Sequence, residues 1–287
     1  MMNLLKIIAI VIFVSLMLET GFQVNRDRLL AILRDYSLLG RTFLANFILV
    51  PLYGVLLAQL FHLDRFIGTG FLLMSIAPGG AGALITGGRR VGGSLGFAVS
   101  SVFLMRVLSI LTVPITAHLI FPAGSYAHVP TRHLVVTIAV FQLLPLLIGM
   151  LVADRAPTVA AKLHRPVTLL LLISALAFIV LVFPTLAKAV ASVYGTRGIM
   201  AMLVIVILSL ATGWLLGGPE REYRRTLSFV TALRNFGFGA LVATDSFPGT
   251  PVAAAVVAYF LVQVIVTSLF QNYLMRTAKK LTAGEVR

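Results

Sequence analysis

Nine long apolar segments occupy most of this 287-residue chain and limit what it can fold into. They cover about residues 3–21, 37–61, 66–87, 94–121, 133–153, 166–184, 198–217, 227–245 and 250–275. An α-helix of roughly 17–25 apolar residues crosses the hydrocarbon core of a bilayer, and most of these segments have that length. Only 11% of the residues are charged, against about a quarter in soluble domains. We therefore predict an all-α polytopic membrane protein with about nine transmembrane helices.

The basic residues predict how these spans are oriented. Sixteen of the 23 Lys and Arg residues lie in 22–36 with the adjoining Arg41, 88–93, 154–165, 218–226 and 276–287, which share one side of the membrane. Five lie on the other side, and Arg106 and Arg234 lie within spans. Lys and Arg concentrate in cytoplasmic loops, so we expect an external N-terminus and a cytoplasmic tail at 276–287. This asymmetry accounts for the net charge of +14 without nucleic acid as a partner.

The first segment resembles a signal peptide in having one lysine before an apolar core. It lacks a clear small-residue cleavage site, so we expect it to remain as the first span. The brevity of the chain and of its loops favours a cell membrane of the bacterial inner-membrane type. The lipid bilayer is thus the first partner that the sequence predicts.

Several kinds of chemistry are excluded by what the sequence lacks. It contains no cysteine, which rules out disulfides, Cys-ligated metals and thiol catalysis. Its five histidines share no metal-ligand spacing, and no nucleophile–base pair is evident. The glycine-rich stretch GGRRVGG at 87–93 lacks the spacing of a phosphate-binding loop and is better explained as a basic cytoplasmic turn. We expect neither an enzyme nor a cofactor or metal site.

Two of the nine segments are interrupted near their middle. Pro78-Gly79-Gly80 interrupts 66–87, and Arg234-Asn235, followed by two glycines, interrupts 227–245. In a membrane a broken helix persists only where protein or a water-filled cavity covers the free backbone groups. A matched pair of broken helices in two halves of a chain is typical of the substrate site of a secondary transporter. The alternative for either break alone is close helix packing through small residues.

These motifs and their order resemble those of the bile acid:sodium symporter family. In that family one crossed helix carries a PGG break, and a second carries Glu-x-Gly-x-Gln-Asn-x-Gly-Leu-Ala. Here SIAPGGAGALITGG and VTALRNFGFGA occupy those places, and NFILVPLYG, FQLLPLLIG and ATGWLLGG resemble family segments in the right order. The resemblance extends from about residue 7 to 275.

The resemblance implies a single transporter domain, residues 1–287, in the nine-span form of the family. It implies an inverted repeat, with a first copy at about 1–121 and a second at about 133–275. It also implies a panel domain beside a core domain, in which two broken helices cross and the substrate binds at the crossing.

The chain departs from the family at the positions that hold sodium. Val230 replaces the family's glutamate and Arg234 replaces its glutamine, while Asn235 is kept. The Ser-Asn pair after PGG is replaced by Ala83 and Leu84. Of two hydroxyl positions in the next span, one is Phe97 and the other is Ser101, and the amide of the span at 37–61 is present as Asn46.

Sodium as the coupling ion is therefore doubtful. An arginine at mid-span is costly and normally marks a transport pathway or a partner. We expect Arg234 to act as a surrogate for the ion and to contact Asn46, carbonyls of the broken helix or an anionic substrate. For Arg106 the alternatives are an anion-attracting vestibule and a structural role in which it caps carbonyl groups or snorkels.

The leading hypothesis is a secondary transporter that moves a small organic anion by alternating access without classical sodium coupling. The predicted substrate-binding residues are Gly79, Gly80, Ala81, Thr86, Asn235, Arg234 and Gln263. The predicted equivalents of the ion site are Asn46, Ser101 and Arg234. Two alternatives stay open: a proton-coupled carrier or uniporter on the same scaffold, and a non-transporting membrane receptor that retains the fold.

Overall fold

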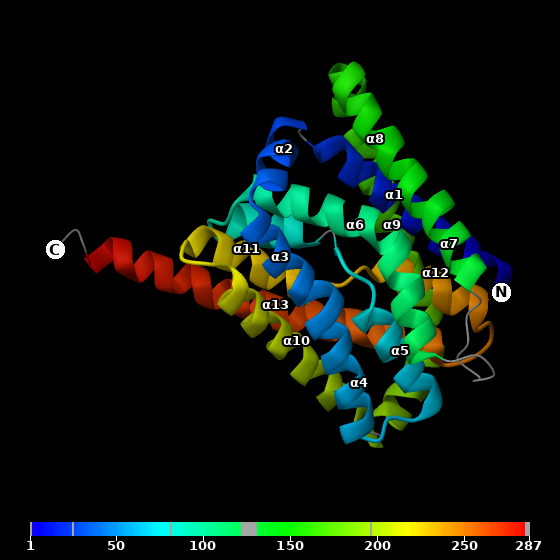
Figure 1. Ribbon diagram of the computed structural model, residues 1–287. Helices are drawn as coiled ribbons and strands as arrows, with labels where there is room; N and C mark the ends of the chain where they lie inside the picture. The colour runs from blue at the N-terminus through cyan, green and yellow to red at the C-terminus, as the bar shows by residue number, and fades with distance from the viewer. Residues whose placement is uncertain (1, 25, 81, 122–130, 196, 285–287) are drawn as a thin grey trace.

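The described part of the chain is built from helices, and it contains no β-strand (Figure 1). The computed structural model describes residues 2–24, 26–80, 82–121, 131–195 and 197–284. Eight helices in these ranges are long and apolar enough to cross a membrane: Leu4–Gln23, Tyr36–Leu60, Leu95–Ile120, Arg132–Arg155, Pro157–Phe183, Gly198–Leu216, Arg221–Ser246 and Val252–Thr277. The predicted segment 66–87 is not among them, because its helix ends at Ser75. The all-α polytopic fold is confirmed, whereas nine uninterrupted spans are not.

The helices largely coincide with the predicted spans, although several spans are divided into two or more helical segments. The first half comprises α1 (Met2–Gln23), α2 (Arg26–Arg34), α3 (Tyr36–Phe43), π-helical η1 (Leu44–Leu49), α4 (Val50–Leu60), α5 (Arg65–Ser75), π-helical η2 (Leu84–Arg90) and α6 (Leu95–Ile120). The second half comprises α7 (Thr131–Ile138), π-helical η3 (Ala139–Leu143), α8 (Leu144–Arg155), α9 (Pro157–Gly195), α10 (Gly198–Leu216), α11 (Arg221–Ala232), α12 (Phe236–Ser246) and α13 (Val252–Gly284).

Three predicted connections are more helical than expected. Most of 22–36 forms α2, most of 154–165 is the first part of α9, and α13 continues through the predicted tail to Gly284. Pro157 opens α9, where a proline fits because the first N–H groups of a helix have no intrahelical acceptor. Polar composition indicated loops here, but the helical parts of these stretches are interrupted only briefly, as between Arg155 and Pro157.

Two of the π-helical turns place an amide side chain inside the protein. Each lies just before a proline: η1 before Pro51 and η3 before Pro145. Proline has no N–H, so it disrupts the regular ladder, and wider turns of this kind are common at functional sites. Asn46 in η1 and Gln142 in η3 are both buried.

The helices form two groups. In one group α1 packs along α8 and α9, and in the other α10 packs against α11 and α13 while α13 packs against α5 and α12. Figure 1 shows α1 and α8 together, with α10 on the other side of the molecule and α13 running across it toward α12. The groups meet mainly where α1 contacts α12 and where α9 contacts α13. The division into a panel and a core domain stays a prediction.

A close approach between α1 and α8 depends on glycine. A Cβ atom on Gly149 would lie 2.6 Å from the Leu18 carbonyl oxygen and 3.0 Å from the Gly21 Cα atom. Gly40 is a matched contrast, because a Cβ there meets nothing within 4 Å. We expect Gly149→Ala to lower the Tm in detergent by several degrees, since overpacking costs typically about 1–3 kcal/mol. Gly40→Ala is the control and should leave Tm unchanged; equal Tm values for both variants would contradict this packing.

Candidate functional site

The two breaks cross and are joined by their own backbones. The Gly80 N–H donates to the Leu233 carbonyl, and the Asn235 N–H donates to the Ala77 carbonyl, each at 2.9 Å. Glycine is required on the first break, because Gly79 has a φ of +80° and a Cβ on Gly80 would lie 2.5 Å from the Leu233 oxygen. Free backbone groups of each broken helix thus satisfy those of the other.

The Arg234 guanidinium lies beside this crossing and is fully buried, with 1% exposure. Its Nε donates to the Met74 carbonyl at 3.3 Å, and one Nη2 bond, of 2.5 Å, reaches the Ser75 carbonyl. The remaining N–H groups bond the Asn46 side-chain oxygen at 3.2 Å, the Asn46 carbonyl at 3.3 Å and the Thr231 carbonyl at 3.5 Å. A guanidinium has five N–H donors, and here all five have an oxygen acceptor. The predicted contacts with Asn46 and with broken-helix carbonyls are confirmed.

Amide side chains complete the second break. The Arg234 N–H donates to the Gln263 side-chain oxygen at 3.0 Å, and the Gln263 amide donates back to the Arg234 carbonyl at 3.4 Å. Asn235 caps α12 by accepting from the Phe238 N–H at 3.2 Å, and its amide donates to Gln142 at 3.4 Å. Asn235 and Gln263 therefore both hold backbone ends in place.

A second buried arginine, Arg106 of α6, also contacts the first break. It is fully buried; its Nε donates to the Gly79 carbonyl at 3.2 Å, and Nη1 bonds the Thr20 hydroxyl of α1. Gln142 donates to the Arg106 carbonyl at 2.7 Å. The carbonyl-capping role is thus present. The Arg106 Nη2 atom, however, is buried without a hydrogen-bond partner among the described residues.

A cavity of about 280 Å³ opens beside the crossing, between α1, α9, α12 and α13. Its lining is mainly apolar, and its polar side chains include Glu19, Gln23, Thr168 and Gln263. Phe236 and Gly237, the first residues of α12, also line it. The first N–H groups of a helix lack intrahelical acceptors and carry partial positive charge, so this end of α12 favours negative charge.

The predicted site residues differ in whether they line the cavity. Gly80, Arg234 and Gln263 line the cavity. Among the described residues, Gly79, Asn235, Thr86, Asn46, Ser101 and Arg106 do not line it. The Gly80 N–H is bonded across the crossing, the Ser101 hydroxyl is buried without a partner among the described residues, and Thr86 is partly exposed in η2. Ala81 lies outside the described residues.

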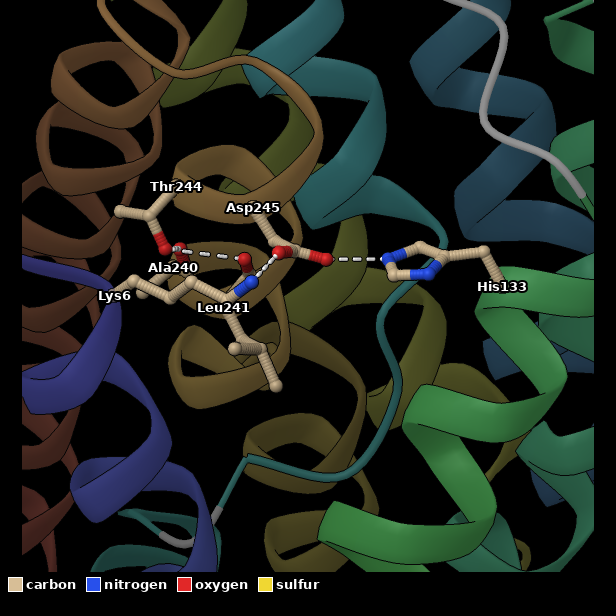
Figure 2. Close-up of polar contacts among 6 residues, drawn as sticks. All are labelled: Lys6, His133, Ala240, Leu241, Thr244 and Asp245. Carbon is tan, nitrogen blue, oxygen red and sulfur yellow. Dashed lines mark hydrogen bonds and ion pairs between the residues drawn. The ribbon is translucent and has the colours of Figure 1, made fainter. Parts of the chain in front are cut away.

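An ion cluster joins the two helix groups at one end of α12 (Figure 2). Asp245 forms an ion pair with Lys6 of α1 through one carboxylate oxygen and contacts the His133 imidazole of α7 through the other. Asp245 is largely buried, whereas Lys6 and His133 are about half exposed. Figure 2 shows the carboxylate between the two basic side chains.

Sequence reasoning missed several of these residues. Gln142 was not among the predicted site residues, although a polar residue three positions before a mid-span proline was a usable signal. The role of Thr20 and the pairing of Lys6 with Asp245 had no local signal, because the partners lie on separate helices. Glu19, which lines the cavity, was also not among the predicted site residues.

The geometry defines a class of protein. Paired, crossing broken helices with a cavity beside them, in a polytopic helical membrane protein, are features of membrane transporters. A sequence profile of the Sodium Bile acid symporter family matches residues 9–193, and the chain belongs to this family. It is thus a multi-pass membrane protein of a transporter family.

Two curated relatives match about three quarters of this chain, but the match covers different shares of the relatives themselves. The chain is 27% identical over 216 residues to the Uncharacterized protein YbaS of Bacillus subtilis, which covers 72% of the chain and 69% of that protein. It is 24% identical over 227 residues to the human P3 protein, covering 75% of the chain and 46% of that protein. The chain therefore spans about half the length of the human relative.

Substituting Arg234 tests whether its guanidinium stabilises the crossing. We expect Arg234→Met to lower the Tm in detergent by roughly 5 °C or more, because a buried acceptor without a donor costs about 1–3 kcal/mol. The Tm of Arg234→Lys should lie between those of the unsubstituted protein and Arg234→Met, since an ammonium group has only three donors. The exposed Arg132→Met variant is the control. A Tm for Arg234→Met equal to that of the control would show that the guanidinium and its five oxygen acceptors do not stabilise the crossing.

Proposed function

We propose that this protein is a secondary transporter of a small organic anion that works by alternating access without sodium coupling. One observation carries the proposal: the guanidinium of Arg234 occupies a cage of five oxygens at the crossing. Rings of carbonyl oxygens are what proteins use to replace the hydration shell of a metal cation. A covalently attached cation in such a cage leaves no place for an exchangeable one.

Two features support an organic anion as the substrate. The N-terminal end of α12 opens on the cavity and presents partial positive charge through Phe236 and Gly237. The rest of the lining is mostly apolar, including Leu233 and Phe260, which suits the hydrocarbon part of an organic acid. In the proposal Gly80 and Gln263 form the polar edge of this site, and Arg234 and Asn235 hold its shape.

In the proposal each repeat, about 1–121 and 133–275, contributes one break, and a buried amide from each half of the chain lies near the crossing. Asn46 on η1 bonds the Arg234 side chain, and Gln142 on η3 bonds the Asn235 side chain. Each amide lies in a π-helical turn just before a proline, and each reaches the second break. A proton-coupled carrier or uniporter fits the same geometry, and a non-transporting receptor would bind ligand without flux.

Replacing sodium by potassium tests the absence of a sodium site. We expect the Tm of the protein to be the same in NaCl and KCl, because a ligand that binds only the folded state raises Tm and no such sodium ion is bound. The double variant Val230→Glu with Arg234→Gln supplies the carboxylate and amide found in the family, and its Tm should rise in NaCl alone. Sodium-specific stabilisation of the unsubstituted protein would contradict the proposal.

Alternating access requires the two helix groups to separate at one end at a time. The Asp245 cluster ties α12 to α1 and α7 at the end that we predict to be external, while Glu19 and Gln23, near the other end of α1, line the cavity. We propose that this cluster closes the external side in the observed state. A second cavity, of about 130 Å³, lies at this end and is lined by Leu5 and Ala243.

The natural absence of cysteine allows a direct test of this closure. Ala243 has 0% exposure, so a cysteine placed there should react slowly with a membrane-impermeant thiol reagent. We expect Asp245→Asn in the Ala243→Cys protein to raise the labelling rate about tenfold, a change that corresponds to 1.4 kcal/mol. Asp154→Asn, at an exposed acid, is the matched control. An unchanged rate in the Asp245→Asn protein would show that the cluster does not hold this side closed.

A further inference from the structure

The cavity contains one acidic side chain, Glu19, and the proposed function gives no reason for an acid in a site that binds an anion. Glu19 of α1 lines the cavity together with Gly80 of the first break and Phe236 of the second. Its side chain is largely buried, with 9% exposure, and it forms no ion pair among the described residues. A carboxylate here shares its space with the proposed organic anion.

The surroundings of Glu19 favour a group that gains and loses a proton. Gln23, one turn along α1, donates to a Glu19 oxygen at 3.4 Å, and the Thr168 hydroxyl also bonds Glu19. The charged or titratable groups that act on it are Arg106 of α6 and His164 of α9. Burial disfavours the charged form of a carboxyl group, whereas these basic groups favour it.

Among the described residues, His164 and Arg106 are the charged or titratable groups that act on Glu19. The close contacts of α8 and α12 with α1 include Gly149 of α8, and Gly237 and Phe238 of α12. The one acid of α12, Asp245, pairs with Lys6, thirteen residues before Glu19 and thus about 20 Å away along the helix. The charge state of Glu19 therefore depends on its burial and on His164 and Arg106.

Arg106 provides a second and independent observation. Its Nη2 atom is buried without a hydrogen-bond partner among the described residues, although Nε and Nη1 hold Gly79 and Thr20. Thr20 is the neighbour of Glu19, so one guanidinium group contacts both the first break and the segment that carries the carboxyl group. The positive charge of Arg106 acts on Glu19, and within the described part of the chain its Nη2 atom keeps a free N–H donor beside the segment that carries this carboxyl group.

We propose that Glu19 is the proton-binding group that couples proton transport to the transport of the organic anion. Hydronium on one side of the membrane gives a proton to the Glu19 carboxylate and leaves as water, and the resulting neutral acid no longer repels the anion in the shared cavity. Anion and proton then cross together and are released on the other side, where Glu19 returns to the carboxylate. The inference rests on the proposed function for its substrate and supplies the coupling ion that the filled cage at Arg234 excludes.

The experiment uses anions that cannot follow a pH gradient by themselves. Tritiated taurocholate and labelled 2-naphthalenesulfonate are salts of strong acids, so they do not cross a bilayer as neutral molecules. In proteoliposomes with an acidic exterior we expect uphill accumulation by the unsubstituted protein. Its apparent Kd should rise with pH, by up to about tenfold per pH unit, which is the limit for one linked proton.

Glu19→Gln separates coupling from binding. Glutamine keeps the size of the side chain and the oxygen that Gln23 bonds, but it cannot exchange a proton. We expect this variant to retain exchange of labelled for unlabelled anion, to bind independently of pH and to lose all accumulation driven by the pH gradient. Glu19→Asp should recover part of that accumulation, and Glu222→Gln, at an exposed acid on α11, should behave as the unsubstituted protein does. Gradient-driven accumulation by Glu19→Gln equal to that of the unsubstituted protein would overturn the inference.

A measurement on the carboxyl group itself keeps the two proposals distinguishable. Infrared spectra of the protein in bilayers should show the carbonyl stretch of a buried carboxylic acid at low pH, lost on raising the pH and absent from Glu19→Gln. If this band is missing from the unsubstituted protein, the proton site is wrong whatever the transport data show. If the band is present but neither anion is exchanged, the organic-anion proposal fails and proton binding at Glu19 stands.

Discussion

Two broken helices inside a membrane protein create free backbone groups that must find partners, and the crossing depends on how this is done. The breaks bond each other at Gly80 and Asn235, and the guanidinium of Arg234 collects carbonyl oxygens from three segments. An unpaired backbone group away from water costs as much as a lost hydrogen bond or more. The arginine therefore supplies donors to carbonyl groups of three segments that meet at the crossing.

A tethered cation differs from a bound metal ion in one physical respect: it cannot leave. A site that fills and empties links the state of the crossing to an ion gradient, whereas a guanidinium with all five donors bonded keeps the crossing in one state. In the proposed carrier, movement therefore occurs between the two helix groups. Among the described residues, few polar bonds join α1, α7 and η3 to α6 and α12: Asp245 with Lys6 and His133, Arg106 with Thr20, and Gln142 with Arg106, Ser109 and Asn235.

The sequence was sufficient for the spans and breaks because both depend on local composition. Apolar length predicted the helices, and Pro78 and the glycines predicted the interruption after Ser75. Family resemblance placed Arg234 near Asn46, and the hydrogen bonds confirm that contact. Gln142, and the pairing of Lys6 with Asp245, could not be found in this way, because they depend on how α1, α7 and α12 pack. The long α9 was missed because polar residues indicated a loop where no residue ends the helix.

The charges along α1 connect the crossing to both ends of the molecule. Lys6 contacts α12 at one end of the helix, Thr20 contacts Arg106 near the other, and Glu19 faces the cavity beside Thr20. Because a helix is stiff over about 20 Å, a shift of α1 that breaks the first contact also moves the other two. Proton binding at Glu19 and opening at Asp245 would then be linked through one rigid element, and linkage between two sites acts equally in both directions. A carrier with a fixed cation at its crossing can in this way still respond to an ion gradient.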